Sequence, residues 1–172
     1  MPTFQKYEKY AASSAYTITL ASLASDTNLL VGREGATIDN SVLGYDDYIV
    51  GGFVTVASSG TLTANRSIEL WAVGPIHDSL WPSPFAGSDA ARTISLQANK
   101  NNICYLVWSA LTSSTNGLVY RFSQRSIRQA FRGVLPEKFS LFMTQSTGQA
   151  VTANSSDHGI WIKGVYPQFA TV

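Results

Sequence analysis

Charged side chains are scarce in this sequence. Lysine, arginine, aspartate and glutamate make up 13% of its 172 residues, which is about half the usual share, and the formal charge is +1. A nearly neutral chain has no long-range field that would draw it to nucleic acid or to an anionic membrane surface, so we expect neither as a partner. A chain with few charges has little solvated helix surface. The low charge also suggests that a binding partner covers part of the protein surface.

Cysteine is almost absent as well. Cys104 is the only one, which excludes an internal disulfide framework and argues against a cysteine-based zinc site. It lies within the apolar run at 103–108, where a buried and unreactive thiol is the expected role.

Long apolar segments are also missing. No run approaches the roughly 20 residues that span a membrane, and residues 1–10 lack the apolar stretch of a signal peptide. We therefore expect the product to stay in the cytoplasm where it is made, or to be assembled there into something larger, without a membrane partner.

What the sequence does contain is a series of short segments with strand character. The clearest is 66–73, where Ile68, Leu70 and Ala72 share one side of an extended backbone. Similar segments are predicted at 15–23, 48–57, 94–98, 103–111, 117–123, 138–145 and 159–166, with an asparagine-rich hairpin turn at 99–102. The predicted fold is therefore all-β, an antiparallel β-sandwich of jelly-roll type with about eight strands. A closed eight-stranded barrel is the alternative, because strand number and alternation fit it equally well.

Only one segment has a helical pattern. Within 123–133, Ile127 and Phe131 share a face, Ser123 or Ser126 is placed to cap the start, and Gly133 suits the end. This pattern predicts one short helix near 124–132.

Three arginines fall on that predicted helix. Arg125, Arg128 and Arg132 have spacings of three and four residues, which would align them in one stripe. A solvated helix face is one interpretation. Contact with an acidic partner surface is the sharper one, and it makes these residues candidates for partner binding.

Residues 1–12 are predicted to form an N-terminal arm, and residues 13–172 one β-sandwich domain. Phe4, Tyr7 and Tyr10 are spaced three apart among polar residues, which suits a short amphipathic helix or an extended tail lying on a neighbour. Trp81 lies in a proline-rich loop, where an aromatic side chain has little ordering entropy left to lose on binding. These four aromatic residues are the candidate anchors for a partner.

The sequence contains only weak matches to the motifs of catalytic sites. His77 and Asp78 are adjacent, but no G-x-S-x-G motif supplies a nucleophile, and His158 lies in no metal-binding spacing. The acidic candidates for glycoside cleavage lie mostly at strand ends or in loops, where such residues are ordinary: Asp46, Asp47, Glu69, Asp89 and Glu137. We expect no enzyme activity, no catalytic or metal-binding residues and no cofactor. Carbohydrate binding through Trp71, beside Glu69, or through Trp81 is an alternative.

Four segments resemble small virion proteins of tailed bacteriophages. They are SLASDTNLLVGRE at 22–34, TANRSIELWAV at 63–73, LPEKF at 135–139, and the TQSTG turn at 144–148 ahead of an aromatic last strand. The resemblance implies a β-rich virion protein that binds the outside of the capsid as a decoration or cement protein. The expected partners are the major capsid protein, other virion proteins and further copies of itself in a homo-oligomer. A neck, tail or fibre-adaptor protein of the same virion is the alternative.

Overall fold

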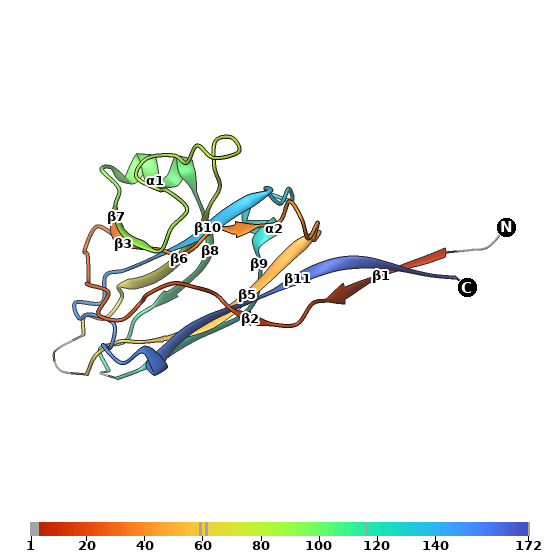
Figure 1. Ribbon diagram of the computed structural model, residues 1–172. Helices are drawn as coiled ribbons and strands as arrows, with labels where there is room; N and C mark the ends of the chain where they lie inside the picture. The colour runs from red at the N-terminus through yellow and green to blue at the C-terminus, as the bar shows by residue number, and fades with distance from the viewer. Residues whose placement is uncertain (1–3, 59, 61, 116, 172) are drawn as a thin grey trace.

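Two antiparallel sheets pack face to face in the computed structural model, which describes residues 4–58, 60, 62–115 and 117–171 (Figure 1). The first sheet contains β1 (Phe4–Tyr10), β2 (Ser14–Ala15), β5 (Asp47–Thr55), β9 (Val119–Ser126) and β11 (His158–Thr171). The second sheet contains β3 (Val31–Glu34), β4 (Ile38–Asp39), β6 (Ser67–Val73), β7 (Ala90–Thr93), β8 (Cys104–Leu111) and β10 (Lys138–Gln145). The strand orders are β1-β11-β5-β9, with β2 also on β11, and β7-β3-β10-β6-β8, with β4 also on β10.

This arrangement confirms the predicted all-β sandwich. The two sheets are separate, so the sandwich and not the closed barrel is the architecture of the described residues. The finer jelly-roll connectivity stays a prediction. The strands outnumber the roughly eight expected mainly because β2, β3, β4 and β7 have two to four residues each, too few to show a period in the sequence.

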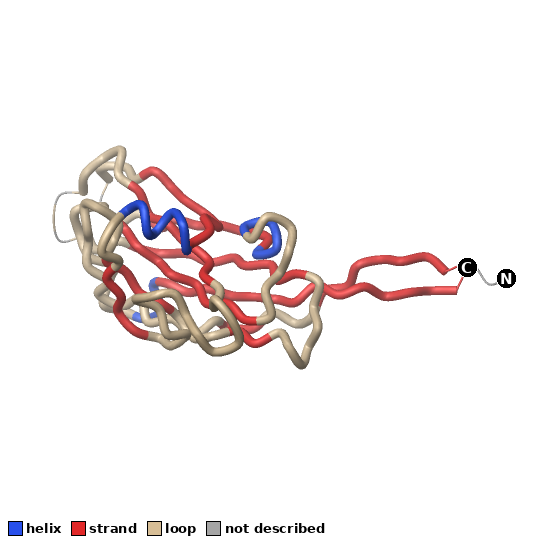
Figure 2. Tube along the Cα trace, turned by 90° about the horizontal axis from the view of Figure 1, so that it is seen from above, coloured by secondary structure: helices blue, strands red, loops and turns tan. Residues whose placement is uncertain are grey.

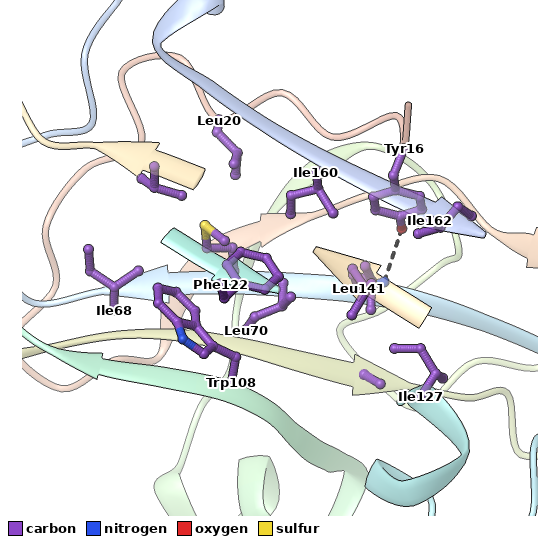
Figure 3. Close-up of a cluster of buried hydrophobic side chains, with 14 of the residues drawn as sticks. Tyr16, Leu20, Ile68, Leu70, Trp108, Phe122, Ile127, Leu141, Ile160 and Ile162 are labelled. Carbon is purple, nitrogen blue, oxygen red and sulfur yellow. Dashed lines mark hydrogen bonds between the residues drawn. The ribbon is translucent and has the colours of Figure 1, made fainter. Parts of the chain in front are cut away.

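The main core lies between the sheets. Ile68, Leu70 and Ala72 of β6 are fully buried, as their alternation predicts, and face residues of the first sheet such as Phe122 (Figure 3). Trp108 of β8 stacks on Phe122 of β9, with ring centroids 4.6 Å apart, and so closes one side of the sandwich where both sheets end. The alternation of half-buried and buried residues in β6 therefore directs every second side chain into the core.

The strand predicted at 15–23 is wrong beyond Ala15, because the chain leaves the sheet after β2. Tyr16 turns inward instead. Its hydroxyl donates to the carbonyl oxygen of Ala36 (2.6 Å) and accepts from the backbone N–H of Leu141 (3.0 Å), a contact drawn in Figure 3. Burial raises the pKa of Tyr16 to about 12, so the phenol remains a neutral donor. These two bonds tie the irregular segment to the second sheet.

The second sheet is covered on its outer face too. Val73, Cys104 and Phe142 form a smaller apolar cluster there, together with Phe85 and Ile94 from the segments that cross over the sheet. Seven consecutive residues of β10, from Phe139 onward, are buried because both faces of this strand are covered. Cys104 is buried and free, as expected from its apolar surroundings.

A helix, α1 (Gln97–Ile103), replaces the strand and hairpin turn predicted over 94–102. The prediction was wrong because tertiary contacts decide this segment: Lys100, one turn into the helix, is completely buried and bonds to groups from distant parts of the chain. A second helix, α2, spans only Ile127–Ala130, inside the predicted 124–132. Neither of these helices, nor the 3-10 turn η1 (Ser155–Asp157), is long and apolar enough to cross a membrane.

The predicted arm is half of a two-stranded ribbon. β1 pairs with the end of β11, with Tyr10 opposite Val165 and each earlier residue of β1 opposite a later one of β11. Figures 1 and 2 show this ribbon leaving the sandwich and running on by itself, with residues 4 and 171 paired at its tip. Residues 1–3 of the predicted arm lie outside the described residues. The C-terminal strand, which the sequence analysis assigned to the sandwich, forms the other half of the arm.

Candidate partner-binding surfaces

The β1 half of the arm is exposed, whereas most described side chains of its β11 half are half-buried. All described side chains of β1, from Gln5 to Tyr10, are exposed, and Tyr10 and Phe169 keep 56% and 62% of their surface free. Tyr7, a predicted anchor, is also exposed, whereas the side chain of Phe4 lies outside the described residues. A two-stranded ribbon without a third strand or a packed face is marginally stable in water. The arm is therefore a surface that gains stability when something covers it.

The root of the arm is fixed. The ring of Tyr45 stacks on Tyr166 of the arm, with centroids 5.9 Å apart, and meets Tyr48 of the core edge-on at 5.4 Å. The same ring covers Gly164 and leaves no room there for a Cβ atom. On the other face, the Lys163 Nζ lies 4.9 Å from the centre of the Tyr10 ring. These contacts hold the direction of the arm at its base, and beyond them the backbone of the ribbon runs away from the sandwich (Figure 2).

Three loops beside this root expose apolar side chains. The loop at 40–46 carries Val42, which is 90% exposed, and is joined to Glu137 by a backbone bond from Asn40 (2.8 Å) and to the arm by one from Asp46 to Val165 (2.8 Å). The loops at 74–80 and 131–137 meet in a hollow of about 320 Å³ whose lining is mostly apolar: Gly74, Pro75, Ile76, Pro82, Asn102, Ile103, Tyr105, Phe131 and Pro136. The hollow therefore gathers apolar side chains at this end of the sandwich.

Trp81 does not protrude from its loop as a free anchor. It is half-buried against the outer cluster of the second sheet, and its ring packs over Gly87, whose positive φ (+67°) lets the backbone pass beneath it. The exposed large apolar residues of the same loop are Ile76 (67%) and Leu80 (50%). A role of Trp81 in partner binding stays a prediction, but its ring is half-buried because the cluster beneath the loop is assembled from residues far apart in the chain.

The proposed sugar-binding wall at Trp71 and Glu69 is filled from within. Lys100 places its Nζ 2.8 Å from Oε2 of Glu69 and 4.5 Å from the centre of the Trp71 ring, and it also donates to the carbonyl oxygen of Leu29 (2.8 Å). The Trp71 Nε1 donates to the same carboxylate oxygen (2.9 Å). Helix α1 therefore covers the face of Trp71 that a sugar ring would need.

An aromatic pair that was not predicted from the sequence, exposed Trp161 on half-buried Phe53, lies on the open face of the first sheet. Trp161 is 41% exposed and stacks on Phe53, with centroids 5.7 Å apart. Together with Arg121 and Ser123 they line a surface hollow of about 440 Å³. The signal was present in β11, where Trp161 lies between the inward-facing Ile160 and Ile162 and must point outward.

The three candidate arginines do not share a helix face, so the predicted stripe is wrong. Arg125 lies in β9, Arg128 in α2, and Arg132 follows α2 with a left-handed backbone (φ 58°). The strand continues to Ser126 because Arg125 still pairs with Val50, across a bulge. All three side chains are exposed and none forms an ion pair with another described residue, so they remain available to an acidic surface.

Most of the acidic candidates serve the fold. Asp47 accepts from the Ser126 hydroxyl (2.6 Å) and from the backbone N–H of Arg128 (2.8 Å), which fixes the start of α2. Asp89 pairs with Arg33 at 2.5 Å, and Glu69 with Lys100. These carboxylates face partners of their own and do not converge on a shared cleft.

One buried acid escaped the sequence analysis. Glu34 of β3 is fully buried, pairs with Arg92 (2.5 Å) and accepts from the backbone N–H groups of Ala86 and Gly87. It holds the proline-rich loop onto the second sheet. Nothing in its local sequence distinguishes it from a surface glutamate, because its partners come from more than 50 residues away.

Each of the two histidines is adjacent to an aspartate, Asp78 beside His77 and Asp157 beside His158, in a different part of the fold. His77 is exposed in the loop at 74–80, and burial lowers the pKa of His158 at the start of β11. Within the described ranges no three His, Cys, Asp or Glu side chains come close enough to hold a metal ion.

Comparison with known proteins adds no identity to this geometry: no protein-family model matches the chain, and a search of curated proteins finds no match.

Proposed function

We propose that this protein is a structural subunit of a tailed-bacteriophage virion that binds the outside of the capsid as a decoration or cement protein. The observation that carries the proposal is the arm: a ribbon anchored at its root by Tyr45 and Tyr166 whose aromatic side chains beyond the root have no partner in the described chain. Such a ribbon is costly to maintain unless another surface covers it. The resemblance of four segments to small virion proteins of tailed bacteriophages is the reason for proposing a phage particle as the assembly.

The end of the sandwich beside the arm supports the same role. Exposed Val42, Ile76 and Val134 lie on loops that backbone bonds and prolines hold in place, so binding costs them little ordering entropy. Arm and loops together offer a broad contact of many modest interactions. Repetition of such a contact by the symmetry of a shell gives stable attachment without a single tight site.

The test is binding to assembled shells. The protein is mixed with shells of the major capsid protein from the same genome, and with unassembled capsid subunits, and each mixture is sedimented. We expect stoichiometric binding to shells, and loss of at least about tenfold in affinity when Tyr7, Tyr10 and Phe169 are all changed to serine, because interface aromatics carry much of the binding energy. Leu111→Ser, at the 74% exposed end of the edge strand β8, is the matched control and should bind normally.

Two results would contradict the proposal. Binding to isolated necks or tails and not to shells would assign the protein to those structures, which the sequence resemblance equally allows. Full shell binding by the arm variant would remove the arm from the contact. Because the three aromatic residues are exposed and the Lys163 contact of Tyr10 is weak, the unfolding free energy of the variant should fall by no more than about 1 kcal/mol, which separates lost binding from lost folding.

The Phe53–Trp161 hollow favours carbohydrate binding as a second candidate function. Exposed Trp161, stacked on half-buried Phe53 beside Arg121 and Ser123, offers a stacking surface and hydrogen-bond donors to a sugar. A glycan array probed with the wild type and with Trp161→Ala tests it: binding lost in the variant supports this function, and no binding by the wild type removes it.

A further inference from the structure

The two long edges of the arm differ in their ability to accept another strand. The phase of its hydrogen bonds follows from two backbone contacts at the root: Ala11 N–H donates across the ribbon to Gly164 (2.8 Å), and Asp46 N–H donates to Val165 from the opposite side (2.8 Å). Because the bonding direction alternates along an antiparallel pair, the odd-numbered residues of β1 bond to β11. The N–H and C=O groups of Lys6, Glu8 and Tyr10 therefore point away from β11, along a free edge.

The other edge is blocked. The pairing of β11 with β5 ends at Val165. By the same alternation, the next residue of β11 whose backbone nitrogen points away from β1 is Pro167, opposite Glu8, and proline has no N–H to donate. A proline at this place is a usual device against unwanted strand addition. No proline occurs in β1, so of the two edges of the arm the one along β1 has an N–H at every outward-facing position from Lys6 to Tyr10.

We infer that a second copy of this chain occupies this edge, with β1 of one copy pairing antiparallel to β1 of the other about a two-fold axis at Tyr7. The sequence of the strand is self-complementary in that register. Lys6 lies opposite Glu8 of the second copy, and by symmetry the reverse, while Tyr7 faces Tyr7 and Gln5 faces Lys9. Opposite charges and aromatic pairs placed directly across a strand pair are stabilising, so charge complementarity selects the partner.

Two conditions select this register: the outward-facing residues of the two copies must lie opposite each other to form backbone hydrogen bonds, and like charges must not meet. Moving it by one residue in each strand, so that the axis falls on Lys6 or Glu8, would bring two like charges directly opposite each other, which is destabilising. The chosen register also uses the whole of β1, from residue 4 to residue 10, and pairs the outward-facing backbone groups of Lys6 and Glu8 with each other. The result is a four-stranded sheet, β11-β1-β1-β11, in place of two marginal ribbons.

The geometry leaves room for both copies. β1 runs from the tip of the arm toward the sandwich, so antiparallel pairing places the two sandwiches at opposite ends of the shared sheet (Figure 1). The contact is isologous and closes at two copies. Lys6 also lies 3.7 Å from Asp46 within one chain, but both side chains are exposed (57% and 43%), so this contact is loose enough to yield.

Charge reversal tests the register. Sedimentation velocity over a concentration series should show a dimer for the wild type, and Glu8→Lys and Lys6→Glu should each raise its dissociation constant at least about tenfold, because two attractive pairs become repulsive. An equimolar mixture of the two variants should dimerise again, since every lysine then faces a glutamate. Lys9→Glu makes the same charge change opposite an uncharged Gln5 and is the control that should dimerise normally.

Cross-linking tests the axis. Residues at the two-fold form a pair without backbone bonds, where Cα atoms lie about 4.5 Å apart, which is within reach of a disulfide. Tyr7→Cys should therefore give a covalent dimer on mild oxidation, whereas Lys9→Cys should not, because its copy lies four residues away along the sheet. The buried Cys104 does not compete.

A wild type that sediments as a monomer at every concentration would overturn the inference, and so would a dimer that neither charge reversal weakens. Cross-linking of Lys9→Cys equal to that of Tyr7→Cys would overturn the register. The measurement uses the free protein, so its result is independent of whether the protein binds a shell.

Discussion

Replacing Lys100 with methionine removes a charge that the fold buries completely. The Nζ of this lysine lies 2.8 Å from the Glu69 carboxylate, 2.8 Å from the carbonyl oxygen of Leu29 and 4.5 Å from the centre of the Trp71 ring. No water reaches the ammonium, so all of its solvation comes from these three groups. Methionine has nearly the same length and fills the space without making the polar contacts, which isolates the charge from the packing.

The expected loss in the free energy of unfolding depends on the hydrogen bonds and solvent exposure that Glu69 retains without Lys100. Breaking a buried ion pair by removing one partner costs about 3–5 kcal/mol, because the other charge is left uncompensated. Glu69 still accepts from Trp71 Nε1 (2.9 Å) and from the Ser67 hydroxyl (3.2 Å), and 17% of its side chain is exposed. We therefore expect the lower end, about 3 kcal/mol. For a chain of this length that corresponds to a drop of about 6–12 °C in Tm.

This loss of stability is measured by urea unfolding of four proteins: wild type, Lys100→Met, Glu69→Gln and the double variant. Because the two side chains contact each other, the double variant should lose clearly less stability than the sum of the single losses. Lys163→Met is the control, since this lysine lies over Tyr10 at 4.9 Å but only partly buried, and its loss should stay below about 1 kcal/mol. A Lys100→Met protein within about 1 kcal/mol of the wild type, or strict additivity, would refute the reasoning.

Two further predictions concern titration. Partial burial raises the pKa of Asp89, but hydrogen bonds from Arg33 and Thr19 outweigh it and hold the pKa below its ordinary 3.8. A lowered folded-state pKa adds stability that is complete above the unfolded value and is lost as the pH falls through the folded one, so urea stability should drop below about pH 4, and less steeply in Asp89→Asn. Burial raises the pKa of Cys104 to about 12, so at neutral pH a thiol reagent should modify the native protein only as fast as it unfolds; rapid modification of the folded protein would contradict this.

Much of the fold follows from local pattern. The alternation in β6 places Ile68, Leu70 and Ala72 in the core, and the same rule applied to β11 would have placed Trp161 outside. Ser126 and Gly133 bound the turn of α2 as their residue types suggest: the Ser126 hydroxyl accepts from Gln129 N–H (2.9 Å), and Gly133 has a positive φ (+96°). In each of these cases the deciding interaction lies within a few residues of the chain.

The features that sequence reasoning missed depend on contacts across long sequence distances. Helix α1 forms where a turn was expected because Lys100 reaches Glu69 and Leu29, and Glu34 is buried because Arg92 and the loop at 86–87 close over it. The arm is the extreme case, since its two strands come from opposite ends of the chain. No local window contains both halves of such a pairing, so the candidate surface could be located at residues 1–12 but its form could not.

The position of the few charges connects the fold to assembly. Three ion pairs, Lys100–Glu69, Arg92–Glu34 and Arg33–Asp89, are half-buried or deeper and fasten the segments that cover the second sheet. They are committed to the fold and cannot direct recognition. The arm instead carries Lys6, Glu8 and Lys9 within seven residues, all exposed, in a chain where only 13% of residues are charged. Where charge is scarce, an alternating set on an open strand edge fixes which strand can pair there and in which register, because a mismatched edge brings like charges together.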